Sequence, residues 1–495
     1  MKFKHAVAPR EICSVTLDED GAAKFEYAVL NQYWYQMFLD DLPVWGMVGE
    51  VVVSEDATEE ALYVFTHKKF VIAYNGDQII EVSLTAENPQ LIEAGAELVF
   101  TYSLDWEETD IAFEDRFSRY LDKSFFEHQI HYFSLFNSFM MVIFLVGLVF
   151  MILMRTLKRD FARYNRDEED DIPIGDDSGW KMIYGDVFRS PPSLAMFSAV
   201  LGTGVQLLVL TAFILGVSMT KALYQSRGAL LTMGIFIYAF TNVVAGYVSG
   251  SYYKAGGGEA WKSTMMLTAG LFPGVVFALT FVLNAIAISY NSLSALPFTS
   301  VLAVVLIWAF VAFPLTLVGT LFGRSLAGES DAPFKPKKVP RHIPDKPWYL
   351  QPLVLIHLGG VLPFASCFLE IYFVLASFSH HMYFHVYGLL LLVFVILVIV
   401  QGSCAVVVTY LTLASEDWRW QWLSVLSSAS TAVYVFLYSV YYFVARTRME
   451  GVLQTSVFFG WSALACFALA TMTGTVGFMA SRKFVYTIYS SVKVD

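Results

Sequence analysis

The chain has 495 residues, of which 56% are apolar, 16% aromatic and only 15% charged, with a net charge of −11. Soluble domains carry about 25% charged residues, so this composition excludes an ordinary soluble protein. A membrane protein is expected where apolar residues gather in runs of about 18 or more.

Residues 1–132 differ in composition from the rest of the chain. They contain 25 acidic and 9 basic residues, a net charge of −16. Alternating stretches at 61–84 and 97–106 predict β-strands, and Asn75-Gly76 divides the first stretch into a hairpin. A further strand is predicted at 13–17. We therefore expect an antiparallel β domain whose acidic residues form a solvated surface rather than a cation site.

The first residues do not resemble a signal peptide. A signal peptide needs an apolar core of about 7–15 residues, and the segment "MKFKHAVAPREICSVTLDED" has none. We expect that the chain lacks its natural beginning. The alternative is that the span that follows translocates residues 1–132 as a long tail.

The remainder of the chain predicts nine transmembrane helices. The first apolar run is 133–154. The others lie at about 194–220, 229–251, 263–289, 298–323, 352–378, 384–412, 423–445 and 453–480. The expected fold class is therefore a multi-span α-helical membrane protein with a transmembrane domain over 133–480.

The loops predict how these helices are oriented in the lipid bilayer. Short cytosolic loops are enriched in Lys and Arg. The loops on the side of 155–193 carry 19 such residues, and those on the other side carry 4. This difference predicts that the 155–193 loop and the 481–495 tail are cytosolic, and that residues 1–132 are lumenal or extracellular.

Long segments of the chain resemble the transmembrane 9 superfamily, the nonaspanins. They are "YWYQMFLDDLPVWGMVGE" (33–50), "THKKFVIAYNGDQIIEVSL" (66–84), the segment 105–165, "GWKMIYGDVFR" (179–189), "LPFASCFLEIYFVLAS" (362–377) and "ASEDWRWQW" (414–422). The resemblance implies a Golgi or endosomal protein that helps to sort, localise and deliver other membrane proteins to the cell surface. It also implies cargo whose spans are rich in glycine, and a longer lumenal domain in typical members.

The resemblance also implies a role for the C-terminal tail. Lys493 and Asp495 match a Lys-x-Asp/Glu ending that resembles a retrieval signal for the coatomer (COPI) coat. Phe484, Val485 and Tyr486 resemble an aromatic export signal for the COPII coat. Both signals need an extended cytosolic tail. The alternative is that the aromatic residues belong to the interfacial end of the last span.

Three Gly-x-x-x-Gly pairs lie at or near span ends. They are Gly246/Gly250, Gly270/Gly274 and Gly319/Gly323. Glycines four residues apart allow another helix to approach closely. These pairs predict packing within the bundle or, alternatively, a groove for a glycine-rich cargo helix. Pro273, Pro314 and Pro363 should kink their helices or free carbonyl groups for polar contacts.

Glu370 is the one acidic residue deep in an apolar run. A charged side chain at the bilayer centre costs about 2.5 kcal/mol or more. We therefore expect Glu370 to face the bundle interior and to find a hydrogen-bond partner. It serves packing or, alternatively, contacts a cargo helix or relays protons.

None of the remaining polar motifs is typical of an enzyme's active site. His380, His381, Met382 and His385 lie in a short turn with no cysteine, so we expect no metal site there. Glu416, Asp417 and Arg419 predict a local ion pair in a cytosolic turn, bracketed by interfacial tryptophans, and the Pro-rich stretch 332–347 predicts a linker. We expect no cofactor and no nucleic-acid partner. A solute or ion transporter and a receptor with a lumenal ligand-binding domain remain the alternatives.

Overall fold

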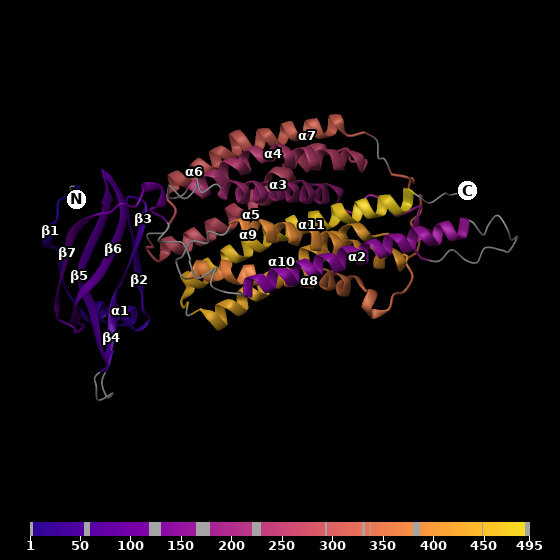
Figure 1. The fold of residues 1–495 in the computed structure, drawn as a ribbon. Coiled ribbons are helices and arrows are strands. Elements are labelled where there is room, and N and C mark those ends of the chain that lie inside the picture. The colour runs from indigo at the N-terminus through magenta and orange to yellow at the C-terminus, as the bar shows by residue number, and fades with distance from the viewer. Residues whose placement is uncertain are drawn as a thin grey trace. The chain divides into compact units, whose positions relative to one another are not determined.

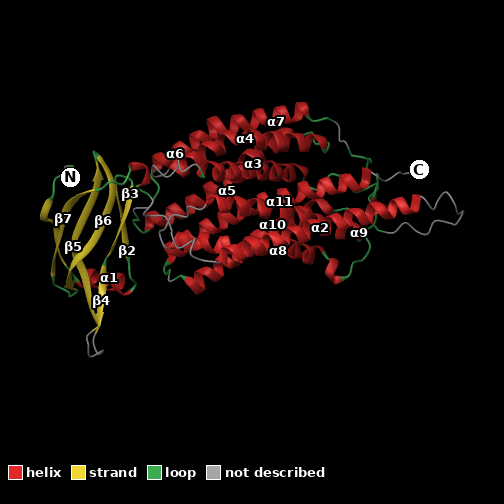
Figure 2. Ribbon diagram, viewed as in Figure 1, coloured by secondary structure: helices red, strands yellow, loops and turns green. Residues whose placement is uncertain are grey.

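The computed structural model describes residues 3–53, 60–117, 130–164, 179–219, 229–292, 295–328, 332–336, 338–379, 387–447 and 449–490 (Figure 1). The chain forms two compact units. The first is Met1–Leu121 with Lys221–Ala229, and the second is Asp122–Thr220 with Leu230–Asp495. Figure 2 shows strands in the first unit and a bundle of helices in the second.

The N-terminal unit is built mainly of β-strands. Its elements are β1 (Val7–Thr16), α1 (Glu19–Leu30), β2 (Trp34–Leu39), β3 (Leu42–Met47), β4 (Gly49–Val53), β5 (Glu60–Asn75), β6 (Gln78–Leu91) and β7 (Glu97–Glu108). One sheet has the order β1-β7-β5-β4, with β6 also paired to β5, and β2 and β3 form a separate hairpin. The strands predicted at 13–17, 61–84 and 97–106 are therefore all present.

The sheet is mixed, whereas the sequence predicted an antiparallel one. β5 and β6 form the expected antiparallel hairpin, and Gly76 in its turn has φ of +63°. β7, however, pairs with β5 in parallel, with His67 opposite Thr101. After β6 the chain returns in the direction of β5 and takes the other edge of β5, so this pairing has to be parallel.

Helix α1 has no counterpart among the predicted elements. Its N-cap is Asp18, whose Oδ1 accepts a hydrogen bond from the main-chain N–H of Gly21 at 2.7 Å. Ala22 and Val29 are its buried residues, and they pack in one cluster with Leu17. Only these two residues of α1 are buried, so its apolar face is too narrow to give a clear helical period in the sequence.

The second unit contains all the long apolar helices that the structure describes. They are α2 (Ile130–Tyr164), α3 (Leu194–Ser218), α4 (Ala229–Ala255), α5 (Trp261–Ser289), α6 (Phe298–Ile307), α7 (Phe313–Leu326), α8 (Pro352–Ser379), α9 (Tyr387–Ala414), α10 (Trp420–Arg446) and α11 (Val452–Ser490). A π-helical turn at Trp308–Ala312 joins α6 and α7 into one continuous helix just before Pro314. With α6 and α7 counted as one, the described helices match the nine predicted spans.

These helices have the composition and exposure expected in a bilayer. Eight are long and apolar enough to cross a membrane, and α2 contains a shorter apolar part, Phe136–Ile152. Large apolar side chains point outward from them, such as Phe281 at 76% exposure and Phe310 at 75%. Exposed apolar surface of this extent is stable only in contact with lipid or a partner helix.

Candidate functional site

Charged residues are buried at the short turn between α9 and α10. Asp417 in this turn is 2% exposed. Its Oδ2 accepts a hydrogen bond from Lys346 Nζ at 2.5 Å, and its Oδ1 accepts one from Arg419 Nε at 3.1 Å. Burial raises the pKa of Asp417, but the hydrogen bonds from Arg419 and Lys346 outweigh burial and hold the pKa below its ordinary value. The local ion pair predicted with Arg419 is confirmed.

Glu416 in the same turn joins two loops. It adopts a left-handed conformation with φ of +58°. Its Oε1 accepts a hydrogen bond from the Gly179 N–H at 3.2 Å, and its Oε2 accepts one from Arg341 Nη2 at 3.1 Å. The Pro-rich stretch that the sequence predicted as a linker is therefore fixed to the bundle through Arg341 and Lys346.

Three tryptophans around the turn hold the same loops. The indole N–H groups of Trp418, Trp420 and Trp422 donate to the carbonyls of Arg341, Val187 and Pro192 at 3.2, 2.9 and 2.8 Å. Trp420 is only 2% exposed, so it is a core residue and not an interfacial one as predicted. We call the segment 179–193, the stretch 338–347 and the 415–419 turn the end cap.

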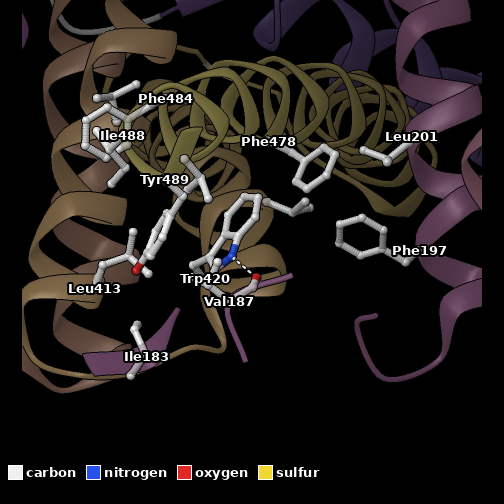
Figure 3. Close-up of a cluster of buried hydrophobic side chains, with 13 residues drawn as sticks. Ile183, Val187, Phe197, Leu201, Leu413, Trp420, Phe478, Phe484, Ile488 and Tyr489 are labelled. Atoms are coloured by element: carbon white, nitrogen blue, oxygen red, sulfur yellow. Dashed lines mark hydrogen bonds between the residues drawn. The ribbon is translucent and has the colours of Figure 1, made fainter. Parts of the chain in front are cut away.

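The last helix ends beneath the end cap. Phe484, Val485 and Tyr489 are 4%, 0% and 0% exposed, and they share one core cluster with Trp420 and Phe478 (Figure 3). The Tyr489 hydroxyl donates to the carbonyl of Trp180 at 2.5 Å.

The predicted extended tail is therefore wrong for residues 481–490, which are helical. Residues 484, 485, 488 and 489 form one apolar stripe at helical spacing, and the end cap buries that stripe. Tyr486 is half-buried and contacts Phe188, with 5.1 Å between ring centroids. Lys493 and Asp495 lie outside the described residues.

Two of the glycine pairs pack against each other. A Cβ added to Gly246 of α4 would lie 2.2 Å from the Thr316 carbonyl oxygen, and one added to Gly319 of α7 would lie 2.1 Å from that of Val243. Gly250 and Gly323 have the same backbone contacts one turn further along, at 2.7 and 2.2 Å. These four glycines therefore serve packing between α4 and α7.

The third pair is free of such contacts. A Cβ added to Gly270 or Gly274 of α5 would meet no atom within 4 Å among the described residues. Gly274 is exposed, whereas Pro273 beside it is buried. Of the three predicted pairs, this one alone leaves its small-residue face open.

Glu370 lies inside the bundle, 4% exposed on α8. Its Oε2 has no hydrogen-bond partner among the residues that the structure describes. Cys367 one turn earlier donates its thiol to the Pro363 carbonyl, and Ser138 of α2 donates to the Ser366 carbonyl at 3.1 Å. The expected partner of Glu370 is therefore not found for this oxygen.

No cluster of metal-ligating residues is present in the described part of the chain. The histidines at 380–385 lie outside it. The end cap is the site that sequence reasoning missed. The sequence features that could have indicated the end cap are the tryptophan-rich turn 418–422 and the basic residues Arg341 and Lys346. Their spacing does not predict contact, because the two groups lie more than 70 residues apart in the chain.

Comparison with known proteins identifies one matching family model and several relatives that share a family name. The sequence model of the family described as endomembrane protein 70 matches residues 1–452. Transmembrane 9 superfamily member 4 of Arabidopsis thaliana is 40% identical over 492 residues, covering 98% of this chain and 83% of the relative. Transmembrane 9 superfamily member 1 of Mus musculus is 37% identical over 513 residues, covering 100% and 84%. No solved structure matches the chain.

Proposed function

Because this chain belongs to the transmembrane 9 superfamily, we propose that it helps to sort and localise other membrane proteins and to deliver them to the cell surface. It is an integral multi-pass membrane protein. We place it in Golgi or endosomal membranes, with the N-terminal β domain in the lumen and the end cap in the cytosol. We assign it no catalytic activity.

The observation that carries this proposal is the open face at Gly270 and Gly274. A face of two glycines four residues apart allows a second helix to approach until backbones touch. On α4 and α7 the same pattern is already occupied by its own partner helix, whereas on α5 an added Cβ would meet no described atom. The occupant that we propose is a glycine-rich transmembrane helix of a cargo protein.

The retrieval signal that we propose is the pair Lys493 and Asp495, read by the coatomer (COPI) coat. An export role for Phe484 and Val485 through the COPII coat conflicts with their burial beneath the end cap. Tyr486, which is half-buried, is the one residue of that motif that a coat subunit reaches without unfolding the helix.

The cargo proposal is tested with Gly270→Leu/Gly274→Leu in the full-length protein. We expect the amount of cargo captured with the protein, and the surface level of that cargo, to fall several-fold. The matched control is Gly147→Leu on α2, where an added Cβ also meets no described atom but no second glycine follows four residues later. Equal loss in both variants, or no loss in either, would reject the groove.

The location of the tagged protein tests the tail separately. Lys493→Ala/Asp495→Ala should move it from the Golgi or endosomes to the cell surface or a degradative compartment. An unchanged location would reject the retrieval signal and leave the cargo groove to be judged on its own variants.

A proton-linked transporter is the second candidate, and it is favoured by Glu370 Oε2, which has no hydrogen-bond partner among the described residues. Buried intramembrane carboxylates are found in proton relays. Solute uptake that depends on a pH gradient, present in proteoliposomes of the wild type and absent with Glu370→Gln, would support transport. Equal uptake in both proteins would reject this role for Glu370.

A further inference from the structure

A hollow opens beside the end cap between α3, α4, α11 and the end of α7. Its volume is about 340 Å³, within the range of small-molecule sites. Apolar side chains line most of it, among them Leu201, Val205, Val248 and Phe478. Figure 3 shows Phe478 between Trp420 and Leu201 within the core cluster.

One cationic group stands at this hollow. Arg482 lines it, and the guanidinium lies 5.7 Å from the ring centre of Tyr252 and 5.2 Å from that of Tyr486. These two rings hold the side chain in place by cation–π attraction. No ion pair or hydrogen bond of the Arg482 side chain is found among the described residues, so its donors are available to a ligand.

A second, smaller hollow adjoins the first. It measures about 60 Å³ and shares Arg482 and Tyr252 with the larger one. Its other walls include the polar residues Ser190 and Gln421. None of the described residues that line either hollow is acidic, so nothing in them repels an anion.

Arg482 lies near the ends of two long apolar helices, where lipid headgroups are expected. Helices α4 and α7 end close by at Ala255 and Leu326. The Lys254 ammonium donates to the carbonyls of Arg324 and Ala327 at 2.7 and 2.9 Å, which closes the end of α7 against α4. Met479 and Tyr247, which line the large hollow, are 54% and 43% exposed, so it is continuous with the lipid-facing surface of the bundle.

We infer that this hollow binds one anionic phospholipid. An acyl chain occupies the apolar volume between Val205, Val248 and Phe478. The phosphate lies at Arg482, whose planar fork of donors matches phosphate geometry. On the orientation predicted from the basic loops this end faces the cytosol, and the cytosolic leaflet is the one rich in anionic lipids.

The inference does not rest on the proposed sorting function, since it concerns a different helix face. A lipid is favoured over a soluble phosphate compound because the greater part of the hollow is apolar. It is favoured over another protein because a single cation with a narrow apolar hollow suits one headgroup and one chain.

The test uses the full-length protein purified in detergent, with added dioleoylphosphatidylserine as the probe and dioleoylphosphatidylcholine as the neutral comparison. Native mass spectrometry measures how many lipids remain bound. We expect one retained phosphatidylserine in the wild type, and about fivefold lower occupancy in Arg482→Gln, the effect of one basic group near a membrane surface. Arg482→Lys should retain part of the binding and serves if the first variant does not fold.

Two further variants separate a specific site from general charge. Lys483→Gln removes the same charge from the neighbouring exposed position, which lines neither hollow, and should leave occupancy unchanged. Val205→Phe fills the apolar part and should reduce retention of phosphatidylserine. Equal losses in Arg482→Gln and Lys483→Gln, full retention in Val205→Phe, or equally strong binding of soluble glycerophosphoserine would each overturn the inference.

Discussion

The indole nitrogen of Trp308 donates a hydrogen bond to the main-chain oxygen of Ala269 at 3.1 Å. Ala269 lies four residues before Pro273, and proline has no N–H to complete the helical bond at that carbonyl. Trp308 belongs to the π-turn between α6 and α7. The α5 carbonyl that Pro273 leaves without a helical partner is therefore hydrogen-bonded by a side chain from the π-turn of the neighbouring helix.

Replacing Trp308 with Phe should destabilise the bundle by about 1 kcal/mol through loss of this hydrogen bond, with any loss of ring packing in addition. Thermal unfolding of the purified protein measures the change. In a Pro273→Ala background, residue 273 supplies its own N–H to the Ala269 carbonyl. Trp308→Phe should then cause a smaller loss of stability. An equal loss of stability in both backgrounds would show that Trp308 stabilises the bundle through ring packing alone.

The glycine pairs give a second prediction, on stability. Gly319→Ala should destabilise the protein by about 2 kcal/mol or more, because its Cβ would lie 2.1 Å from the Val243 carbonyl oxygen and would force α4 and α7 apart. Gly274→Ala is the matched control, since its Cβ would meet no described atom. The melting temperatures of the two variants in detergent should differ clearly, and equal temperatures would contradict the α4–α7 interface described above.

Asp417 gives a prediction on pH. Its pKa is lower in the folded protein than the ordinary value of 3.8, so the folded state favours the ionised form. The resulting stability is fully present above about pH 4 and is lost as the pH falls below this value through the folded pKa. Between pH 5 and pH 7 the end cap should therefore be insensitive to the titration of Asp417.

The Asp417→Asn variant should be destabilised by about 3 kcal/mol, because Lys346, whose side chain is 8% exposed, loses the charge that compensates it. Unfolding measured at pH 7 and at pH 3 should show a large difference from the wild type at pH 7 and a smaller one at pH 3. Asp20→Asn, which removes one partner of an exposed ion pair with Lys24, is the control and should leave unfolding unchanged. A difference that does not depend on pH would rule out the ion pair as its source.

The helices could be predicted from sequence because each span is a long apolar run, and each of the nine runs coincides with a described helix. The ends of α2 at Tyr164 and of α11 at Ser490 lie ten residues beyond the predicted ends, because the helix continues there without a continuous apolar run. The β5–β6 hairpin was predictable because Asn75-Gly76 is a strong local turn signal. Contacts between segments that are distant in the chain leave no comparable local pattern in the sequence. The parallel pairing of β5 and β7, the fit of Gly246 against Thr316 and the bonds from Trp418 to Arg341 depend on how elements meet in space.

The end of α11 illustrates the same limit at a functional motif. The apolar residues of "FVYTIY" at 484–489 fit both an exposed aromatic signal and a buried helical stripe. Only the loop 179–193, nearly 300 residues earlier in the chain, decides between the two. The sequence could place the tail beyond the last span, but it could not show that another loop covers it.

Burial of Phe484 leads to the last prediction. Phe484→Ala should destabilise the protein by about 3 kcal/mol or more, because it removes a side chain that is 4% exposed in the core cluster. A change in cellular location of this variant would then follow from lost packing. Tyr486→Ala, at a half-buried position, should unfold at nearly the wild-type temperature. If Tyr486→Ala folds normally and still fails to leave the endoplasmic reticulum, coat recognition at the surface of α11 is the cause. If only Phe484→Ala is retained there, and its melting temperature is lowered, the motif acts through folding alone.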